Sequence, residues 1–146
     1  MIRTLVIDDD GAHRELLVTL LESEPGFEII GEARDGYDGA AAANRLQPNL
    51  IVSDVQMPRL DGITAVPMYR AAAPKAVVVL MSADPDRDVE ARAMAAGADL
   101  FIDKGTGVDT IIEMLAAAAS RATGQHRVID LGDERRARRE TLSRDI

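Results

Sequence analysis

Cysteine and tryptophan are absent from this chain of 146 residues. Without cysteine, a disulfide scaffold and a cysteine-ligated zinc site are both excluded. Basic residues are scarce, because 17 Lys and Arg are outnumbered by 25 Asp and Glu, and the net charge of −8 argues against a general surface for nucleic acid backbones. No apolar run reaches the roughly 18 residues of a membrane-spanning helix. The composition, 47% apolar, predicts one globular cytoplasmic domain that binds neither a membrane nor, by itself, DNA.

The carboxyl-terminal segment differs in composition from the rest. Residues 1–124 carry a net charge of −9, whereas residues 125–146 carry +1 and contain an arginine-rich stretch at 135–139 with acidic residues on both sides. Few apolar residues are present there to pack a core. We therefore expect a folded domain over residues 1–123 and a charged linker or tail over residues 124–146.

Five short runs rich in Val, Ile and Leu recur through the first 103 residues, with helical stretches between them. The runs begin roughly 20 to 27 residues apart, which is too far for hairpins and suits a strand, a helix and a parallel strand. The expected strands are Leu5–Ile7, Phe27–Ile30, Leu50–Val52, Ala76–Met81 and Leu100–Ile102. The expected helices are Ala12–Glu22, Tyr37–Leu46, Ile63–Ala71, Arg87–Ala96 and Val108–Ala122. This order predicts an α/β fold with a doubly wound parallel sheet and helices on both faces.

Two helices carry local expectations. In the first, the spacing of Leu16, Leu17, Leu20 and Leu21 predicts one apolar face toward the sheet. In the third, Pro67 lies about one turn inside the helix and is expected to kink it or to delay its start, because its nitrogen cannot donate a hydrogen bond.

Polar side chains follow four of the five expected strands, and the second strand, which ends without one, is expected at a sheet edge. The four ends are Asp8-Asp9-Asp10, Ser53-Asp54, Ser82-Ala83-Asp84 and Asp103-Lys104. The carboxyl ends of parallel strands meet at one edge, where ligands bind in such folds. Carboxylates gathered there raise one another's pKa unless they share a cation, and oxygen ligands alone suit Mg²⁺. With a lysine and a hydroxyl nearby, the set predicts a site that handles phosphoryl groups.

Each of these residues also has an ordinary structural interpretation. The three aspartates fit a strand-to-helix turn with an N-cap, Ser82 fits a helix cap, and Lys104 fits an exposed loop. Their occurrence together at consecutive strand ends favours the functional interpretation.

Four segments together resemble the receiver domain of bacterial two-component response regulators. They are the acidic strand end Leu5–Asp10, the segment Leu50–Gly62 with its Met-Pro-x-x-Asp-Gly loop, the strand Val77–Ala83, and Ala96–Lys104. The resemblance covers residues 1–122 and implies a CheY-like, flavodoxin-like sheet of strand order 2-1-3-4-5 flanked by five helices. Within the family, Gly97–Lys104 and Arg127–Asp130 most resemble the NarL/FixJ subfamily.

The resemblance implies a role for each residue at the strand ends. Asp54 would accept a phosphoryl group from a sensor histidine kinase. Mg²⁺, or Mn²⁺, would be held by Asp9, Asp54 and the carbonyl of Gln56, with Asp8 acting through water. Lys104 would contact the phosphoryl group.

Three further positions would respond to or regulate the phosphoryl group. Ser82 would follow it and switch conformation together with Phe101, whereas Gln56 and Asp84 would influence its hydrolysis. Such a protein is not a conventional enzyme, because it catalyses phosphoryl transfer to and from its own Asp54.

This sequence departs from the family pattern at two positions. Gly105 follows Lys104 where many receivers have proline, so the family's loop geometry does not carry over there. Pro67 is uncommon in the third helix and puts the docking surface of that helix in doubt. Neither position touches the expected phosphoryl site.

Two alternatives concern the chemistry. Asp8-Asp9-Asp10-Gly11 also resembles the loop of haloacid-dehalogenase phosphatases, in which Asp8 would be the nucleophile and Asp10 the general acid. That interpretation gives no role to Asp54 or to the loop 57–62. A degenerate receiver that serves only as an interaction module is the other alternative, but all the side chains expected of an active receiver are present.

The output of the domain is a separate question. We expect control of transcription through a carboxyl-terminal helix-turn-helix domain absent from this sequence, or a stand-alone receiver that acts through protein contacts. Homodimerisation on phosphorylation is also expected. The last helix has more apolar residues than one face needs, so they either form a dimer surface or are buried against the sheet. These residues are Ile111, Ile112, Leu115 and the alanines 116–119.

Overall fold

The computed structural model describes residues 1–123, in which strands and helices alternate from the amino terminus. The strands are β1 Ile2–Ile7, β2 Phe27–Ala33, β3 Leu50–Asp54, β4 Val77–Ser82 and β5 Leu100–Asp103. The helices are α1 Gly11–Glu22, α2 Gly36–Leu46, α3 Gly62–Ala72, α4 Arg87–Ala95 and α5 Val108–Thr123. Each element begins and ends within a few residues of its predicted bounds. The tail predicted for residues 124–146 lies outside the described residues.

The sheet is parallel, and its strand order is β2-β1-β3-β4-β5, which confirms the predicted doubly wound fold. β2 lies at one edge, as expected for the strand without a polar end. β1 and β3 are neighbours although a whole strand and two helices separate them in sequence. This crossover is the point at which the strand order reverses, and it brings the ends of β1 and β3 side by side.

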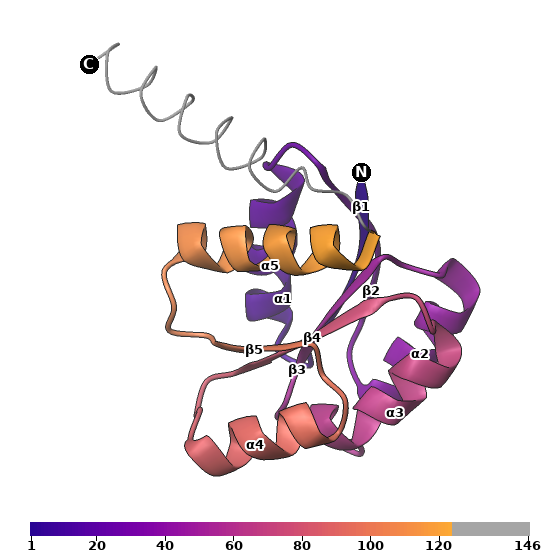
Figure 1. Ribbon diagram of the computed structural model, residues 1–146, viewed down its shortest axis with the longest axis vertical. Helices are drawn as coiled ribbons and strands as arrows, with labels where there is room; N and C mark the ends of the chain where they lie inside the picture. The colour runs from indigo at the N-terminus through magenta and orange to yellow at the C-terminus, as the bar shows by residue number, and fades with distance from the viewer. Residues whose placement is uncertain (124–146) are drawn as a thin grey trace.

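Helices cover both faces of the sheet, and each face has its own core. α1 and α5 lie on one side, whereas α2, α3 and α4 lie on the other (Figure 1). Leu21 of α1 and Leu115 of α5 are fully buried in the first core, and Val66 and Tyr69 of α3 are fully buried in the second. Burial on both faces explains why the strands are apolar without strict alternation.

The buried face of α1 only partly matches the predicted one, because Leu20 is half-buried and Val18 is buried in addition. Leu17, Val18 and Leu21 are buried, whereas Leu16 is 56% exposed. The prediction for Leu16 is therefore wrong. A run of leucines at adjacent positions is wider than the stripe that a helix buries, so the outermost one remains in solvent.

Pro67 neither delays nor interrupts α3. The helix begins at Gly62 after the N-cap Asp61 and continues to Ala72 with Pro67 inside it. Pro67 is exposed. The proline ring thus lies on the solvent side of a helix whose other face is buried.

The apolar excess of α5 is buried. Ile111, Ile112 and Leu115 are each exposed by 7% or less, and Ala117 is the one alanine of residues 116–119 that is not buried. Of the two alternatives for these residues, the structure thus supports packing against the sheet. No helix within residues 1–123 is both long enough and apolar enough to span a lipid bilayer.

Arg70 ties three elements together at the amino-terminal edge of the sheet. Its guanidinium donates to the carbonyl oxygens of Gly97 and Ala76, at 3.0 Å from Nε and 3.1 Å from Nη1. Nη2 also pairs with the carboxylate of Asp99 at 2.7 Å. The same carboxylate accepts the backbone N–H of Val78 at 2.9 Å. One side chain of α3 thus satisfies acceptors from the turns that precede β4 and β5.

Replacement of Arg70 by methionine should lower the free energy of unfolding by about 1–3 kcal/mol, because partly buried carbonyls and a carboxylate lose their donors. Arg92→Met is the matched control, since Arg92 makes only an exposed pair with Asp88 on the same helix. That control should cost no more than about 0.5 kcal/mol. Urea denaturation of the three proteins measures the difference. Equal losses in the two variants would show that the Arg70 network adds no stability.

Candidate functional site

The register of the sheet gathers the polar strand ends at one edge. Ile7 pairs with Ser53, Asp54 pairs with Met81, and Ser82 pairs with Asp103. Residues that directly follow β1 and β5, Asp8 and Lys104, therefore lie beside the end of β3. Four segments far apart in the sequence meet there, as the strand-end pattern predicted.

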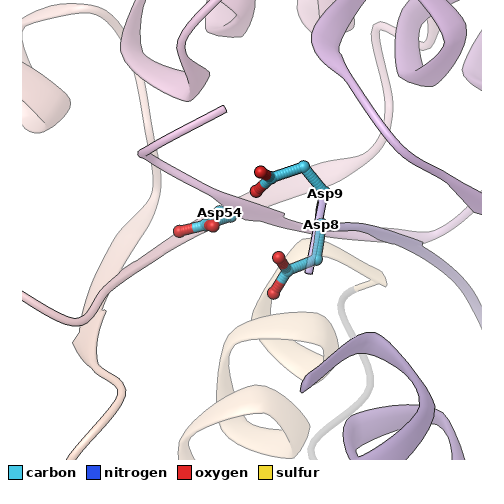
Figure 2. A group of neighbouring side chains, drawn as sticks. All are labelled: Asp8, Asp9 and Asp54. Carbon is cyan, nitrogen blue, oxygen red and sulfur yellow. The ribbon is translucent and has the colours of Figure 1, made fainter. Parts of the chain in front are cut away.

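Asp8, Asp9 and Asp54 form a cluster in which the carboxylate oxygens lie within 4.8 Å of one another. Asp8 and Asp54 are 3% and 5% exposed, whereas Asp9 is exposed at the rim. Figure 2 shows the carboxylates of Asp8 and Asp9, which come from the end of β1, extending toward the side where Asp54 ends β3. Among the described residues, this is the one group of acidic or histidine side chains close enough to hold a metal ion.

Lys104 is the cation of this cluster. Its Nζ lies 3.2 Å from Asp8 Oδ2 and 3.2 Å from Asp54 Oδ2. The side chain of Lys104 is only 14% exposed, so its charge is poorly screened by water. A single lysine therefore bridges two buried carboxylates from strands that are neighbours in the sheet.

Asp54 is left with an excess of negative charge around it. Burial and then the charge of Asp8 raise its pKa from 3.8 to about 6, although Lys104 acts in the opposite direction. Its Oδ1 atom is buried and has no hydrogen-bond partner in the described part of the chain. A buried acceptor without a donor is costly. Both observations fit a carboxylate that binds a cation.

Asp8 departs from the expectation that clustered carboxylates raise one another's pKa. Burial does raise the pKa of Asp8, but the backbone N–H of Asp10, His13 and Lys104 together outweigh it and lower the pKa. His13 Nδ1 lies 2.5 Å from Asp8 Oδ2, and the Asp10 N–H lies 2.9 Å from Oδ1. The sequence analysis expected raised pKa values unless the carboxylates share a cation. The pKa of Asp54 is raised, whereas that of Asp8 is lowered by the Asp10 N–H, His13 and the shared Lys104.

The sequence analysis did not assign His13 or Arg14 to the site. Arg14 donates to the Asp8 carbonyl oxygen at 2.6 Å. Both residues lie in the first turns of α1, directly after the acidic strand end. Asp10 caps this helix by accepting the N–H groups of Ala12 and His13. The signal that could have revealed His13 is its position, since a first helical turn faces back toward the strand that it follows.

Comparisons with known proteins agree with this geometry. Residues 4–116 match the family model of the response regulator receiver domain. The chain belongs to this receiver family.

The chain is similar to one curated protein of much greater length and to two solved receiver domains. It is 40% identical over 107 residues to a protein-glutamate methylesterase/protein-glutamine glutaminase of Symbiobacterium thermophilum, a match that covers 73% of this chain and 30% of that protein. The response regulator domain of Thermotoga maritima CheB superposes with a TM-score of 0.75 at 29% identity, over 82% of this chain and 97% of that one. The signal receiver domain of a putative response regulator NarL of Mycobacterium tuberculosis superposes with a TM-score of 0.76 at 26% identity, over 82% of this chain and 96% of that one. This receiver therefore spans less than a third of the methylesterase that it resembles.

The loop between β3 and α3 is held against the site by close backbone contact. Gly62 N–H donates to the Val55 carbonyl oxygen at 2.8 Å, and a Cβ added at Gly62 would lie 2.1 Å from the Asp54 carbonyl oxygen. Only glycine permits this approach. The Asp-Gly pair of the sequence motif therefore serves two structural needs, because Asp61 caps α3 and Gly62 brings its first turn onto the end of β3.

The remaining predicted site residues lie around this cluster. Ser82 ends β4 fully buried, and its hydroxyl lies 3.2 Å from Gln56 Nε2. Phe101 is half-buried and packs against the core under α2, α3 and α4. Asp84 is exposed, and its N–H donates to Ser82 Oγ at 3.2 Å. All peptide bonds of the described residues are trans, including the one between Lys104 and Gly105.

The stability of the metal-free receiver should depend on pH through Asp54. Because the folded-state pKa is raised from 3.8 to about 6, the stabilising protonated form is fully present below about pH 4 and is lost as the pH rises through 6. Asp54→Asn removes this titration, so the variant should be more stable than the wild type by about 3 kcal/mol at pH 7.5, with the advantage shrinking to a small value near pH 4.

Chemical denaturation in EDTA across pH 4–7.5 measures this difference. Asp84→Asn is the control, because Asp84 is exposed and outside the cluster. A stability difference between Asp54→Asn and the wild type that stays constant over this pH range would contradict the assignment.

Proposed function

We propose that this receiver accepts a phosphoryl group on Asp54 from the phosphohistidine of a sensor histidine kinase or from a small phosphodonor such as acetyl phosphate. The observation that carries the proposal is the buried Asp54 carboxylate, which has Lys104 on Oδ2 and an unpartnered Oδ1. A carboxylate in this setting is both a nucleophile and the centre of a preformed charge arrangement.

The acidic cluster fits a divalent cation. Asp9 and Asp54, with the carbonyl of Gln56, would hold Mg²⁺ or Mn²⁺ directly, and Asp8 would act through water. Three oxygen donors without nitrogen or sulfur suit these ions, and a cation would offset the burial and the Asp8 charge that raise the pKa of Asp54. When bound, the ion neutralises oxygen charge on the transferring phosphoryl group.

The residues of the chain complete the transfer. A carboxylate oxygen of Asp54 attacks phosphorus, the bond from phosphorus to the donor breaks, and the donor leaves with its electron pair. Lys104 stabilises the charge on the phosphoryl oxygens, and the Ser82 hydroxyl donates to one of them. Water later cleaves the acyl phosphate, which releases inorganic phosphate and restores the Asp54 carboxylate. The protein thus catalyses a reaction on itself and is not a conventional enzyme.

Phosphorylation is proposed to switch the face formed by α4, β5 and α5. Ser82 moves toward the phosphoryl group, and Phe101, which is half-buried beneath α4, changes position with it. A ligand shifts such an equilibrium only through different interactions with the two states. The phosphoryl oxygens supply that difference, because Ser82 and Lys104 contact them only when they are present. Gln56 and Asp84 lie beside Ser82 and would influence hydrolysis.

The output is proposed from the resemblance alone. We retain control of transcription through a helix-turn-helix domain as the first hypothesis, with a stand-alone receiver acting through protein contacts as the alternative. Dimerisation on phosphorylation, a cytoplasmic location and the absence of DNA binding by this chain belong to the same proposal. The similarity to a methylesterase adds an enzymatic output as a further possibility. The reading frame around the gene decides among these outputs.

The phosphatase alternative is disfavoured by Asp10. Its carboxylate accepts two backbone N–H groups as the α1 N-cap, so it is occupied in a structural role rather than placed as a general acid. Asp54, which that alternative leaves without a role, lies instead inside the carboxylate cluster.

Incubation with acetyl phosphate and Mg²⁺ should add one phosphoryl group to the intact protein, measured by mass spectrometry. Asp54→Asn should abolish the addition, because the nucleophile is gone. Asp10→Asn is the control and should retain it, since an asparagine also caps a helix. If Asp54→Asn retains the phosphoryl group and Asp8→Asn loses it, Asp8 is the nucleophile and the phosphatase interpretation is correct.

Beryllofluoride with Mg²⁺ should shift the amide NMR signals of Phe101 and of α4 as well as those of the acidic cluster, because the switch couples the two regions. The matched comparison is Ser82→Ala, in which the shifts at the cluster should persist and those at Phe101 should shrink. Changes confined to the cluster in the wild type would count against coupling.

A further inference from the structure

The hydroxyl of Ser82 has no free hydrogen-bonding capacity in this structure. Its oxygen accepts the Asp84 N–H at 3.2 Å and lies 3.2 Å from Gln56 Nε2, while Gln56 Oε1 lies 3.3 Å from the same oxygen as an acceptor. A serine hydroxyl has one proton to donate and two lone pairs that accept. The backbone donor and the two ends of the Gln56 amide account for all three.

Gln56 is well placed to hold this hydroxyl. Gln56 lies two residues after Asp54, which ends β3, and β3 is paired with β4, which ends at Ser82. The contact therefore crosses between two neighbouring strand ends. Ser82 is fully buried whereas Gln56 is exposed, so the Gln56 side chain contacts the hydroxyl from the solvent side of the strand end.

This contact competes with the role proposed for Ser82. A hydroxyl that donates its proton to Gln56 Oε1 is not donating it to a phosphoryl oxygen on Asp54. Phosphorylation must therefore break the Ser82 bond to Gln56 before Ser82 can follow the phosphoryl group. The free energy gained when Ser82 bonds to the phosphoryl group is therefore reduced by the free energy of the lost Ser82–Gln56 hydrogen bond.

We propose that the Gln56 side chain is a positioning residue that holds Ser82 in the resting orientation and thereby opposes the phosphorylated state. This inference rests on the proposed function of Asp54. It concerns the resting conformation of Ser82, and so it differs from an effect of Gln56 on the rate at which the acyl phosphate hydrolyses. The Gln56–Ser82 contact is worth one net hydrogen bond, which corresponds to roughly a two- to tenfold change in affinity for a phosphoryl mimic.

The test uses beryllofluoride with Mg²⁺, because this mimic does not pass through hydrolysis. Gln56→Met keeps the length of the side chain but cannot bond to the hydroxyl, and it leaves the backbone carbonyl at this position intact. The variant should bind beryllofluoride about two- to tenfold more tightly than the wild type. In a Ser82→Ala background, the same substitution should leave the affinity unchanged, since there is no hydroxyl to hold.

An equal change in both backgrounds, or weaker binding by Gln56→Met alone, would overturn the proposal and place the Gln56 side chain in direct contact with the phosphoryl group instead. Unchanged affinity in Gln56→Met would overturn it as well.

A second measurement needs no ligand. The Asp84 amide proton reports on Ser82 Oγ directly, so its NMR signal in the resting protein should shift in Gln56→Met and in Ser82→Ala, with a non-additive result in the double variant. Additive shifts would contradict the contact. If the wild type binds no beryllofluoride but the shifts are non-additive, the proposed function of the site has failed while the contact between Gln56 and Ser82 stands.

Discussion

The site depends on the enforced closeness of two buried carboxylates, Asp8 and Asp54. They end strands that are neighbours only because the sheet order reverses between β1 and β3. Water is largely excluded from both, so their repulsion is strong and is relieved mainly by Lys104 from the end of β5. The hydrogen-bond donors around the two carboxylates are divided unequally between Asp8 and Asp54. Asp8 receives His13 and the Asp10 N–H as well, whereas Asp54 keeps an oxygen without a partner among the described residues.

This inequality separates the roles of the two carboxylates. The donors around Asp8 stabilise its ionised form and lower its pKa, whereas the pKa of Asp54 rises to about 6. Asp54, whose charge has fewer donors around it, is therefore the carboxylate that a cation stabilises most and the one that is available to attack phosphorus. The fold also fixes the backbone at Asp54, because Gly62 has no Cβ and so lets the first turn of α3 pack against the Asp54 carbonyl oxygen.

The strand ends could be predicted from sequence because they depend on order along the chain. Once the five apolar runs are parallel strands, Asp54 and Lys104 must lie at the same edge whatever the details of packing. The details that failed depend on packing alone. The outward position of Leu16 and the donors around Asp8 follow from how the helices pack on the sheet. The contact between Gln56 and Ser82 is of the same kind, since two loops determine it and no spacing in the sequence encodes it.

The most direct test of this account is a calorimetric titration of the receiver with Mg²⁺ at pH 7.5. The account predicts one binding site that Asp54→Asn and Asp9→Asn each weaken at least about tenfold, because each removes a carboxylate that would hold the ion. Asp10→Asn should leave the affinity unchanged, since the side chain of Asp10 caps α1 and the substitution keeps the backbone N–H that donates to Asp8. Equal Mg²⁺ affinity in the wild type and in Asp54→Asn would contradict the claim that the unpartnered carboxylate of Asp54 forms part of a metal site.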